Sequence, residues 1–164
     1  NVGPDDFGSH PLDGVEFQRE WERKAYELGG SNFNAPAQTV GSFLGQEHAP
    51  SIDAGRHSYE PHIVECDLHQ CLPDYVSSVL ERALPYWGRR IHGFDAPEIC
   101  MTGVETRTSS PLRMERDDNR VSNTIGGFYP MGEGAGYAGG IMSAALDGAE
   151  TAIACMSIYA KPSN

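Results

Sequence analysis

Three glycines in the last third of the sequence have the spacing of a nucleotide-binding turn. Gly134, Gly136 and Gly139 spell G-x-G-x-x-G, and a helix is expected from about Gly140 onward. Glycines at this spacing let the backbone approach a phosphate closely, and the helix start adds amide donors. A dinucleotide fold would then need a second strand that carries an acidic residue about 20 positions past the glycines. Only YAKPSN follows the expected helix, so the motif is not the first turn of such a fold.

A second group of polar side chains precedes the glycines. The stretch VETRTSSP and the residues just after it supply five candidates for binding an anionic substrate or lining a cofactor: Arg107, Thr108, Ser109, Ser110 and Arg113. Arginine offers a fixed fork of donors that suits a carboxylate or phosphate. On a strand, the same residues could instead make surface ion pairs with Glu105 and Glu115. The sequence leaves both interpretations open.

Cysteine and histidine spacing predicts neither a metal site nor a disulfide framework. Cys66, His69 and Cys71 lie close together in CDLHQC, but a zinc site would normally present a second ligand pair elsewhere. The sequence contains no C-x-x-C pair, and four cysteines in a chain of this length favour a reduced, cytoplasmic protein. The spacing of serine, histidine and aspartate residues does not indicate a catalytic triad either, so we assign no catalytic residue.

The charge of the chain disfavours two classes of partner. Its formal net charge is −11, whereas nucleic acids and anionic membranes usually require a basic face. No uninterrupted run of 18 apolar residues is present, so no membrane span is expected. We therefore expect neither a nucleic acid nor a membrane as partner.

Hydrophobic spacing predicts two helices in the first half of the chain. Asp13 is a suitable cap for a helix whose apolar residues recur along one face and which Gly29 and Gly30 end. Loops with short extended pieces are expected over 31–57. A second helix is expected to begin at Pro73 and Asp74 and to be broken by Pro85 and Gly88.

The second half has a different character, which sets the predicted fold class. Threonine and valine enrichment over 98–134, with RDDNR as a turn, predicts two or three strands, and a long helix follows from about Gly140. We predict an α+β fold in which residues 1–95 form a helical and irregular cap or substrate region. Residues 96–164 would form a β-rich segment closed by the long C-terminal helix.

Two stretches together resemble a known family. GVETRTSSPLRMERD, followed by GGFYPMGEGAGYAGGIMSAALDGAETAIA, closely resembles the C-terminal end of the bacterial FAD-dependent dehydrogenases, also described as NAD(FAD)-utilising. DFGSHPLDGVEFQREWERKAYELGG and NAPAQTVGSFL resemble the inserted region of that family. The resemblance implies the C-terminal part of an FAD-dependent oxidoreductase, with 1–95 as an inserted cap and 96–164 completing the FAD-binding domain. The N-terminal FAD/NAD-binding portion of a longer parent protein would hold the ADP end of the cofactor and be the partner of this chain.

The resemblance also assigns roles to individual residues. Glu133 would accept a hydrogen bond from a ribityl hydroxyl, the Gly134 amide would face the pyrophosphate, and residues 137–141 would lie at the flavin ring. The implied flavin-binding set is Gly132, Glu133, Gly134, Ala135, Gly136, Tyr137, Ala138, Gly139, Gly140 and Ile141. We expect the isolated chain to be inactive, to bind FAD weakly or not at all, and to self-associate.

Glu133, the glycines and the whole chain each have an alternative interpretation. Glu133 could be a capping carboxylate, and the glycines could serve only close helix packing. The whole chain would then be a non-enzymatic binding or regulatory module.

Overall fold

The structure, a computed structural model, describes residues 2–53, 57–60 and 62–159 of the 164-residue chain. The chain divides into two compact units. The central unit is Gln18–Thr106, and the terminal unit combines the first 17 residues with those from Arg107 onward. These cuts differ from the predicted division at 95/96, which concerned domains of a longer parent and remains a prediction.

The first predicted long helix is confirmed. α2 spans Asp13–Leu28 and is preceded by the short helix α1, Pro4–Phe7. Asp13 is the first residue of α2, and its carboxylate accepts a hydrogen bond of 2.8 Å from the His10 amide. The helix ends as expected at two glycines, where the Gly29 amide donates to Ala25 O at 2.9 Å and Gly30 has a φ of +92°.

The central unit is built on a small mixed sheet in the order β2-β1-β3. β1 (Ala35–Thr39) pairs in parallel with β2 (Ile63–Glu65) and antiparallel with β3 (Cys100–Thr102). Every residue of β1 is buried. The adjoining apolar core consists of Ala25, Val40, Phe43, Leu68, Cys71 and Leu84.

Two short helices carry the core residues that follow the strands. α3 (Val40–Phe43) continues β1 directly, and the Thr39 side chain caps it by accepting from the Ser42 amide. The 3-10 helix η1 (Leu68–Cys71) follows β2, and the Leu68 amide donates to the buried side chain of Gln38 at 2.9 Å.

The second long helix runs past the residue that was expected to break it. α4 spans Asp74–Gly88 and includes Pro85. Because Pro85 has no amide, α4 loses the one hydrogen bond that this residue would donate, and the helix ends three residues later at Gly88. The chain then closes the helix end with bonds from the Arg89 amide to Pro85 O and from the Ile91 amide to Trp87 O.

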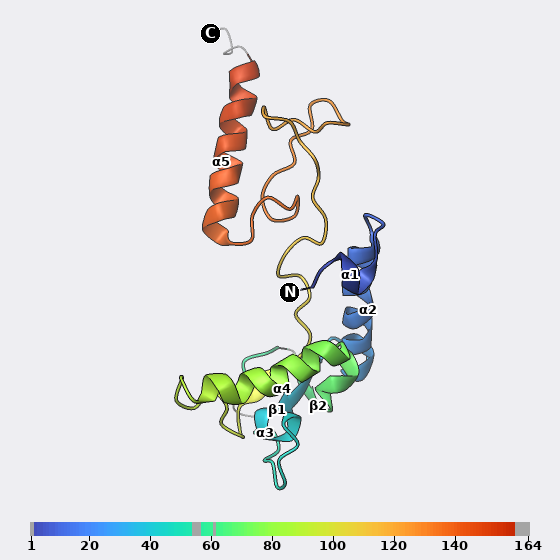
Figure 1. Cartoon of the computed structure of the whole chain (residues 1–164), viewed down its shortest axis with the longest axis vertical. Helices are drawn as coiled ribbons and strands as arrows, with labels where there is room; N and C mark the ends of the chain where they lie inside the picture. The colour runs from blue at the N-terminus through green and yellow to red at the C-terminus, as the bar shows by residue number, and fades with distance from the viewer. Residues whose placement is uncertain (1, 54–56, 61, 160–164) are drawn as a thin grey trace. The chain divides into compact units, whose positions relative to one another are not determined.

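The α+β class and the C-terminal helix are confirmed, but the prediction of a β-rich segment after residue 96 is wrong. The described residues of that segment contain one three-residue strand, β3, and an isolated bridge between Arg116 and Ser122. The chain beside α5 (Ile141–Ile158) is otherwise irregular (Figure 1). A strand needs a neighbour to pair with, and here backbone groups find single partners instead of a ladder, as when the Val121 amide donates to the Asp117 carboxylate.

α5 is the one helix in the described part of the chain that is long and apolar enough to cross a membrane, with a mean hydropathy of 1.3 over 18 residues. Length and composition alone are weak support for a membrane span, because core helices of soluble proteins pass the same test. Asp147 and Glu150 interrupt the apolar sequence of α5, which is why an uninterrupted run was not found in the sequence.

Candidate functional site

The glycine-rich segment before α5 forms a closed turn in the terminal unit. The Tyr137 amide donates to Gly132 O at 3.0 Å, and the Gly136 amide donates to Glu133 O at 2.9 Å. Gly132 and Gly136 have φ values of +71° and +81°, a region that strongly favours glycine. The Glu133 residue at the tip of this turn is exposed.

A carboxylate on α5 holds the start of this turn. Asp147 accepts a hydrogen bond of 2.8 Å from the Gly132 amide. It also binds Arg116 through two hydrogen bonds, of 2.6 and 3.1 Å, and Arg120 through one of 2.7 Å. The Asp147 side chain is only 11% exposed, so these bonds are shielded from water. The Arg116 hydrogen bonds contribute most to holding the pKa of Asp147 well below its usual range.

The two arginines extend this cluster to neighbouring chain segments. Arg116 also donates to Pro130 O at 2.7 Å, and Arg120 also binds Glu150. Sequence reasoning missed Arg116, Arg120 and Asp147. The RDDNR stretch was interpreted only as a turn, and nothing in the sequence links its arginines to a carboxylate on α5.

Tyr137 is fixed from three directions. The guanidinium carbons of Arg116 and Arg113 lie 3.5 and 4.2 Å from the centroid of its ring. The Tyr137 hydroxyl donates to Met114 O at 2.9 Å. Arg113, predicted as a substrate or flavin contact, therefore packs on an aromatic ring within the terminal unit. It does not make the alternative ion pair with Glu115 in any described contact.

The structure brings the two predicted groups of residues together. Ser110 Oγ lies 2.8 Å from Leu112 O and 3.3 Å from Gly134 O, so its hydroxyl can donate to either carbonyl. A Cβ atom at Gly139 would lie 3.9 Å from Ser109 Oγ. The polar stretch therefore runs against the glycine-rich turn, although the roles predicted for its residues remain predictions.

The remaining predicted residues differ in exposure. The Ala135 residue is buried and its carbonyl accepts from the Met114 amide at 3.1 Å. Ala138 is half-buried, whereas Arg107 and Thr108 are exposed. Ala135 thus supports the turn from within, and the exposed residues can still meet another molecule.

The N-terminus of α5 is open to an outside group. Gly140 precedes the helix in an extended conformation and makes no side-chain cap. The bond from the Ala144 amide to Gly140 O, of 2.9 Å, closes the first helical turn. The amides of Ile141, Met142 and Ser143 precede it in the ladder and have no helical partner. Gly139 and Gly140, which lead into the helix, are exposed, and Ile141, its first residue, is 90% exposed. The positive end of the helix dipole therefore lies at an exposed part of the terminal unit.

The cysteines and histidines in the described part of the chain form no comparable site. No group of three or more His, Cys, Asp or Glu side chains there could hold a metal ion. His69 instead contacts Asp67 and Glu81, at 2.8 and 3.1 Å. Burial raises the pKa of the Cys71 thiol to about 11, which leaves it protonated near neutral pH.

Comparison with known proteins identifies the family. A sequence model of the family described as FAD-dependent protein, C-terminal domain-like, matches residues 1–108. The chain belongs to this family. It is also 43% identical over 152 residues to an uncharacterized protein of Clostridium beijerinckii. That alignment covers 92% of this chain and 28% of the relative, so the chain spans little more than a quarter of the relative's length.

Membership of the FAD-dependent C-terminal domain family indicates part of a flavoprotein. The family match does not extend to the dehydrogenase activity or to the use of NAD, which the resemblance of the motifs had implied. The matched residues include the central unit, while the glycine-rich turn lies beyond position 108. The turn suits FAD because its backbone is accessible to a ligand. Gly134, Gly139 and Gly140 are exposed, and a Cβ at Gly134 would meet no atom within 4 Å.

Proposed function

We propose that this chain is the C-terminal part of an FAD-dependent oxidoreductase and supplies the ribityl and isoalloxazine side of its flavin site. The open N-terminus of α5 is the observation that carries the proposal. Its first amides have no helical partner and follow a turn in which Gly134, Gly139 and Gly140 are exposed, so that a ligand can approach the backbone closely there. Family membership supports the cofactor, and the reaction class is our inference.

Bound FAD would supply the hydride and electron chemistry, and the residues of this chain would position it. The amides of Ile141–Ser143 would stabilise negative charge at the edge of the flavin ring. Glu133, exposed at the tip of the turn, would accept a hydrogen bond from a ribityl hydroxyl. Asp147 would hold the turn in place through Gly132 without touching the cofactor.

The outer surface of α5 supports a larger parent protein. Its apolar side chains are between 55% and 90% exposed: Ile141, Met142, Leu146, Ile153, Met156 and Ile158. Soluble proteins rarely leave so many large apolar side chains of one helix uncovered. We propose that the N-terminal FAD-binding portion of the parent covers this surface, and that the parent is cytoplasmic and binds no nucleic acid.

Flavin content of the full-length parent tests the proposal. We expect a yellow protein with about one FAD per chain and a reduced flavin content after Gly139→Val, because the added side chain would occupy the space of the ring. Gly126→Val is the matched control, since Gly126 lies outside the turn and a Cβ there meets no atom within 4 Å. A colourless parent would favour the binding or regulatory module.

A second variant tests the role of Glu133. Glu133→Ala in the parent should weaken FAD retention by about 1.5–3 kcal/mol, the range for a hydrogen bond to a charged group. Glu115→Ala, which removes another exposed carboxylate of the terminal unit, is the control. Equal retention in wild type and Glu133→Ala would show that this carboxylate does not contact the cofactor.

A further inference from the structure

The outer side of α4 carries large apolar side chains that stay exposed. Val79 is 51% exposed, Tyr86 is 42% exposed and Trp87 is 45% exposed. On the opposite side of the helix, Ser77 and Leu84 are buried, and Leu84 belongs to the apolar core. α4 lies entirely within the central unit, so its outer side can be described from that unit alone.

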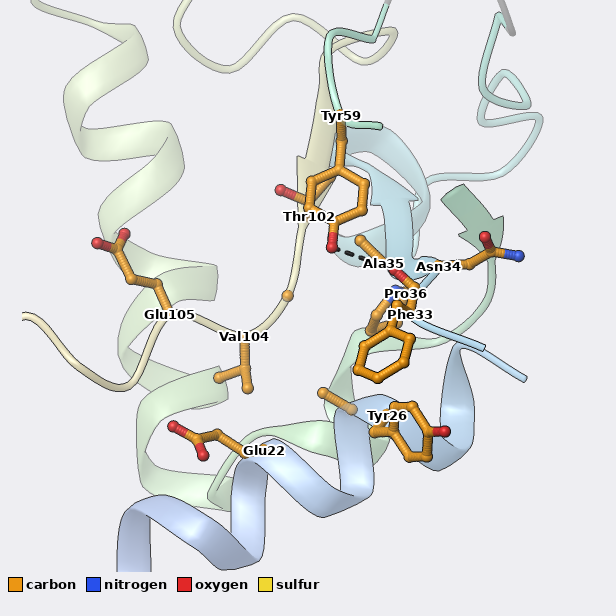
Figure 2. Close-up of a pocket in the computed structure, with 12 residues that line it drawn as sticks. Glu22, Tyr26, Phe33, Asn34, Ala35, Pro36, Tyr59, Thr102, Val104 and Glu105 are labelled. Atoms are coloured by element: carbon orange, nitrogen blue, oxygen red, sulfur yellow. Dashed lines mark hydrogen bonds between the residues drawn. The ribbon is translucent and has the colours of Figure 1, made fainter. Parts of the chain in front are cut away.

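This outer side is separate from the hollow of the central unit. Figure 2 shows that hollow, whose lining residues come from α2, from the chain around β1, from Tyr59, and from β3 and the residues after it. Within the part of the chain that the structure describes, none of the lining residues belongs to α4. The outer side of α4 instead presents the ridges of a helix, and such ridges pack into the grooves of another helix.

Four residues of the outer side have the spacing of a contact between two helices. Val79, Arg82, Tyr86 and Arg89 follow one another in steps of three, four and three residues. Arg89 is the C-cap of α4 and still has helical backbone angles. Steps that alternate between three and four residues keep side chains on one face of a helix, as in coiled coils. All four residues are exposed, so this face is available to a second helix.

The charge at the C-terminal end of α4 differs from that of the whole chain. The chain contains 23 Asp and Glu residues against 12 Lys and Arg residues, but 82–94 includes Arg82, Arg89 and Arg90 and no acidic residue. The guanidinium carbon of Arg90 lies 3.7 Å from the centroid of the Tyr86 ring. None of the three arginines forms an ion pair with a residue that the structure describes. Aromatic residues and arginines are enriched at protein interfaces, so this composition favours a protein partner.

The N-terminal end of the same helix is acidic, which makes α4 complementary to an antiparallel copy of itself. Asp74 is the first residue of α4 and is exposed. An antiparallel copy would bring the acidic end of each helix beside the basic end of the other, where opposite charges attract. A parallel copy would place Arg82 and Arg89 beside the same arginines of its neighbour, and like charges repel. The charges of α4 therefore favour the antiparallel arrangement.

The exposed apolar residues agree with this arrangement. Val79 and Tyr86 are equally far from the midpoint between Arg82 and Ala83. A twofold axis through this midpoint places Val79 of each copy against Tyr86 of the other. Arg82 lies beside the axis, and its long stem lets the guanidinium extend away from its counterpart into solvent. The apolar and the charged residues are thus matched by the same symmetry.

We propose that two copies of this chain associate through the outer side of α4, with the two helices antiparallel around a twofold axis. Val79 packs on Tyr86 of the second copy, and Asp74 pairs with Arg89 of the second copy. Such an interface uses the same surface of each copy. α4 is about 22 Å long at 1.5 Å per residue, so the interface is small and the dimer is reversible. The dimer does not depend on the flavin site, so its absence would leave the proposed oxidoreductase unaffected.

Sedimentation equilibrium of the 164-residue chain tests the proposal. The exposed apolar side chains of α5 offer a second route to association, so the measurement uses the chain with Leu146→Glu and Ile153→Glu. These two residues are 61% and 63% exposed, so the substitutions should leave the fold intact. We expect a reversible dimer in this background. A chain that stays monomeric up to about 0.5 mM would overturn the proposal.

A charge at the centre of the proposed contact should break the dimer. Val79→Glu should raise the dissociation constant by at least about tenfold, because its carboxylate would be buried against Tyr86 of the second copy. Ile125→Glu is the matched control, since Ile125 is 57% exposed, close to the 51% of Val79, and lies outside the central unit. The control should leave the dissociation constant unchanged. Equal effects of the two substitutions would show that any added negative charge opposes association, and would contradict an interface on α4.

Charge reversal tests the antiparallel arrangement. Asp74→Arg alone and Arg89→Glu alone place like charges together at both ends of the dimer, so each should weaken association by about threefold to tenfold. An equimolar mixture of the two variants should restore the dimer, because each mixed dimer again pairs a positive with a negative side chain at both ends. Mixing would not rescue a defect in folding. A mixture that associates no better than the separate variants would overturn the antiparallel arrangement.

Discussion

Asp147 holds three separate segments of the terminal unit together. Its carboxylate binds Arg116, Arg120 and the Gly132 amide, and it does so from a side chain that is 11% exposed. The pKa of Asp147 lies well below its usual range, with the Arg116 hydrogen bonds as the largest cause. A lowered folded-state pKa contributes stability above the unfolded value of about 3.9 and loses it as pH falls through the folded value. The cluster is therefore intact at neutral pH and should fail only in strong acid.

Asp147→Asn should destabilise the terminal unit by about 3 kcal/mol, because two guanidinium groups lose a shielded counter-charge. Urea unfolding at pH 7 gives the free energy, and faster hydrogen exchange at the Gly132 amide gives the location. Asp118→Asn, a change at an exposed residue, should alter the free energy of unfolding by no more than about 0.5 kcal/mol. Unchanged exchange at Gly132 in Asp147→Asn would contradict the role we give to the carboxylate.

Gly136 and Gly139 belong to one motif but differ in what they tolerate. Gly136 has a φ of +81°, and a Cβ there would lie 2.6 Å from Leu112 O. A Cβ at Gly139 would find only an ordinary contact at 3.9 Å. Gly136→Ala should thus lower the free energy of unfolding by about 2 kcal/mol or more, and Gly139→Ala by much less. Urea unfolding compares the two variants, and equal losses would show that the turn is not built as described.

At the scale of elements, His69 links η1 to α4. Its Nδ1 contacts Asp67, the cap of η1, at 2.8 Å, and its Nε2 contacts Glu81 of α4 at 3.1 Å. Partial burial alone would lower the pKa of His69, but the hydrogen bonds to Asp67 and Glu81 raise it overall. The ring also stacks on Phe43 of the core, with centroids 4.3 Å apart. A protonated His69 thus ties two helices to the core through charge as well as packing.

The stabilisation by His69 should depend on pH in a defined direction. Because the folded-state pKa is raised, the contribution is fully present below the unfolded value of about 6.5 and is lost as pH rises through the folded value. The contacts are partly exposed, so the effect should stay within about 1 kcal/mol. The melting temperature should fall more between pH 6 and pH 9 in wild type than in Glu81→Gln.

Two controls accompany this measurement. Glu98→Gln, which removes an exposed carboxylate away from His69, should retain the pH dependence of wild type. NMR titration of the His69 ring should give a pKa above 6.5 that decreases in Glu81→Gln. A titration below that value in wild type would show that burial outweighs the two hydrogen bonds.

At the scale of the whole molecule, most apolar side chains of α5 are not covered by other described residues of the chain. Thr151 is the buried residue of α5, whereas Met142 is 81% exposed and Met156 is 66% exposed. Asp147 and Glu150, the two acidic residues of the helix, are engaged by the arginine pair. The rest of α5 is therefore free to pack against a further protein surface, as our proposal of a longer flavoprotein requires.

The isolated 164-residue chain should bind FAD weakly. It offers ribityl and ring contacts around Glu133 and Gly140, whereas the adenosine and pyrophosphate would be bound by the parent's N-terminal portion. A loss of about 4 kcal/mol weakens affinity about a thousandfold. Titration followed by flavin fluorescence should therefore give a dissociation constant above the micromolar range. Submicromolar binding would show that the cofactor site is built differently from our proposal.

Local patterns in the sequence predicted several parts of this protein. The apolar spacing and the two terminal glycines predicted α2, and the long apolar segment after Gly140 predicted α5. Helices of this kind are recognisable because their hydrogen bonds and apolar faces depend on residues three or four positions apart. The resemblance of its motifs likewise pointed to the FAD-dependent family that the comparison confirmed.

Other features depend on residues that are distant in the sequence, and only the tertiary structure decided them. β1 pairs with β2 and β3 across long intervening segments, and strands of three to five residues are too short for a periodic pattern. Asp147 meets Arg116 only because the irregular segment folds back along α5. The sequence by itself therefore determined the long helices, through the local spacing of their apolar residues, and the family, through the resemblance of its motifs. The sheet and the cluster of Asp147, Arg116 and Arg120 that holds the glycine-rich turn arose from contacts that spacing along the chain does not encode.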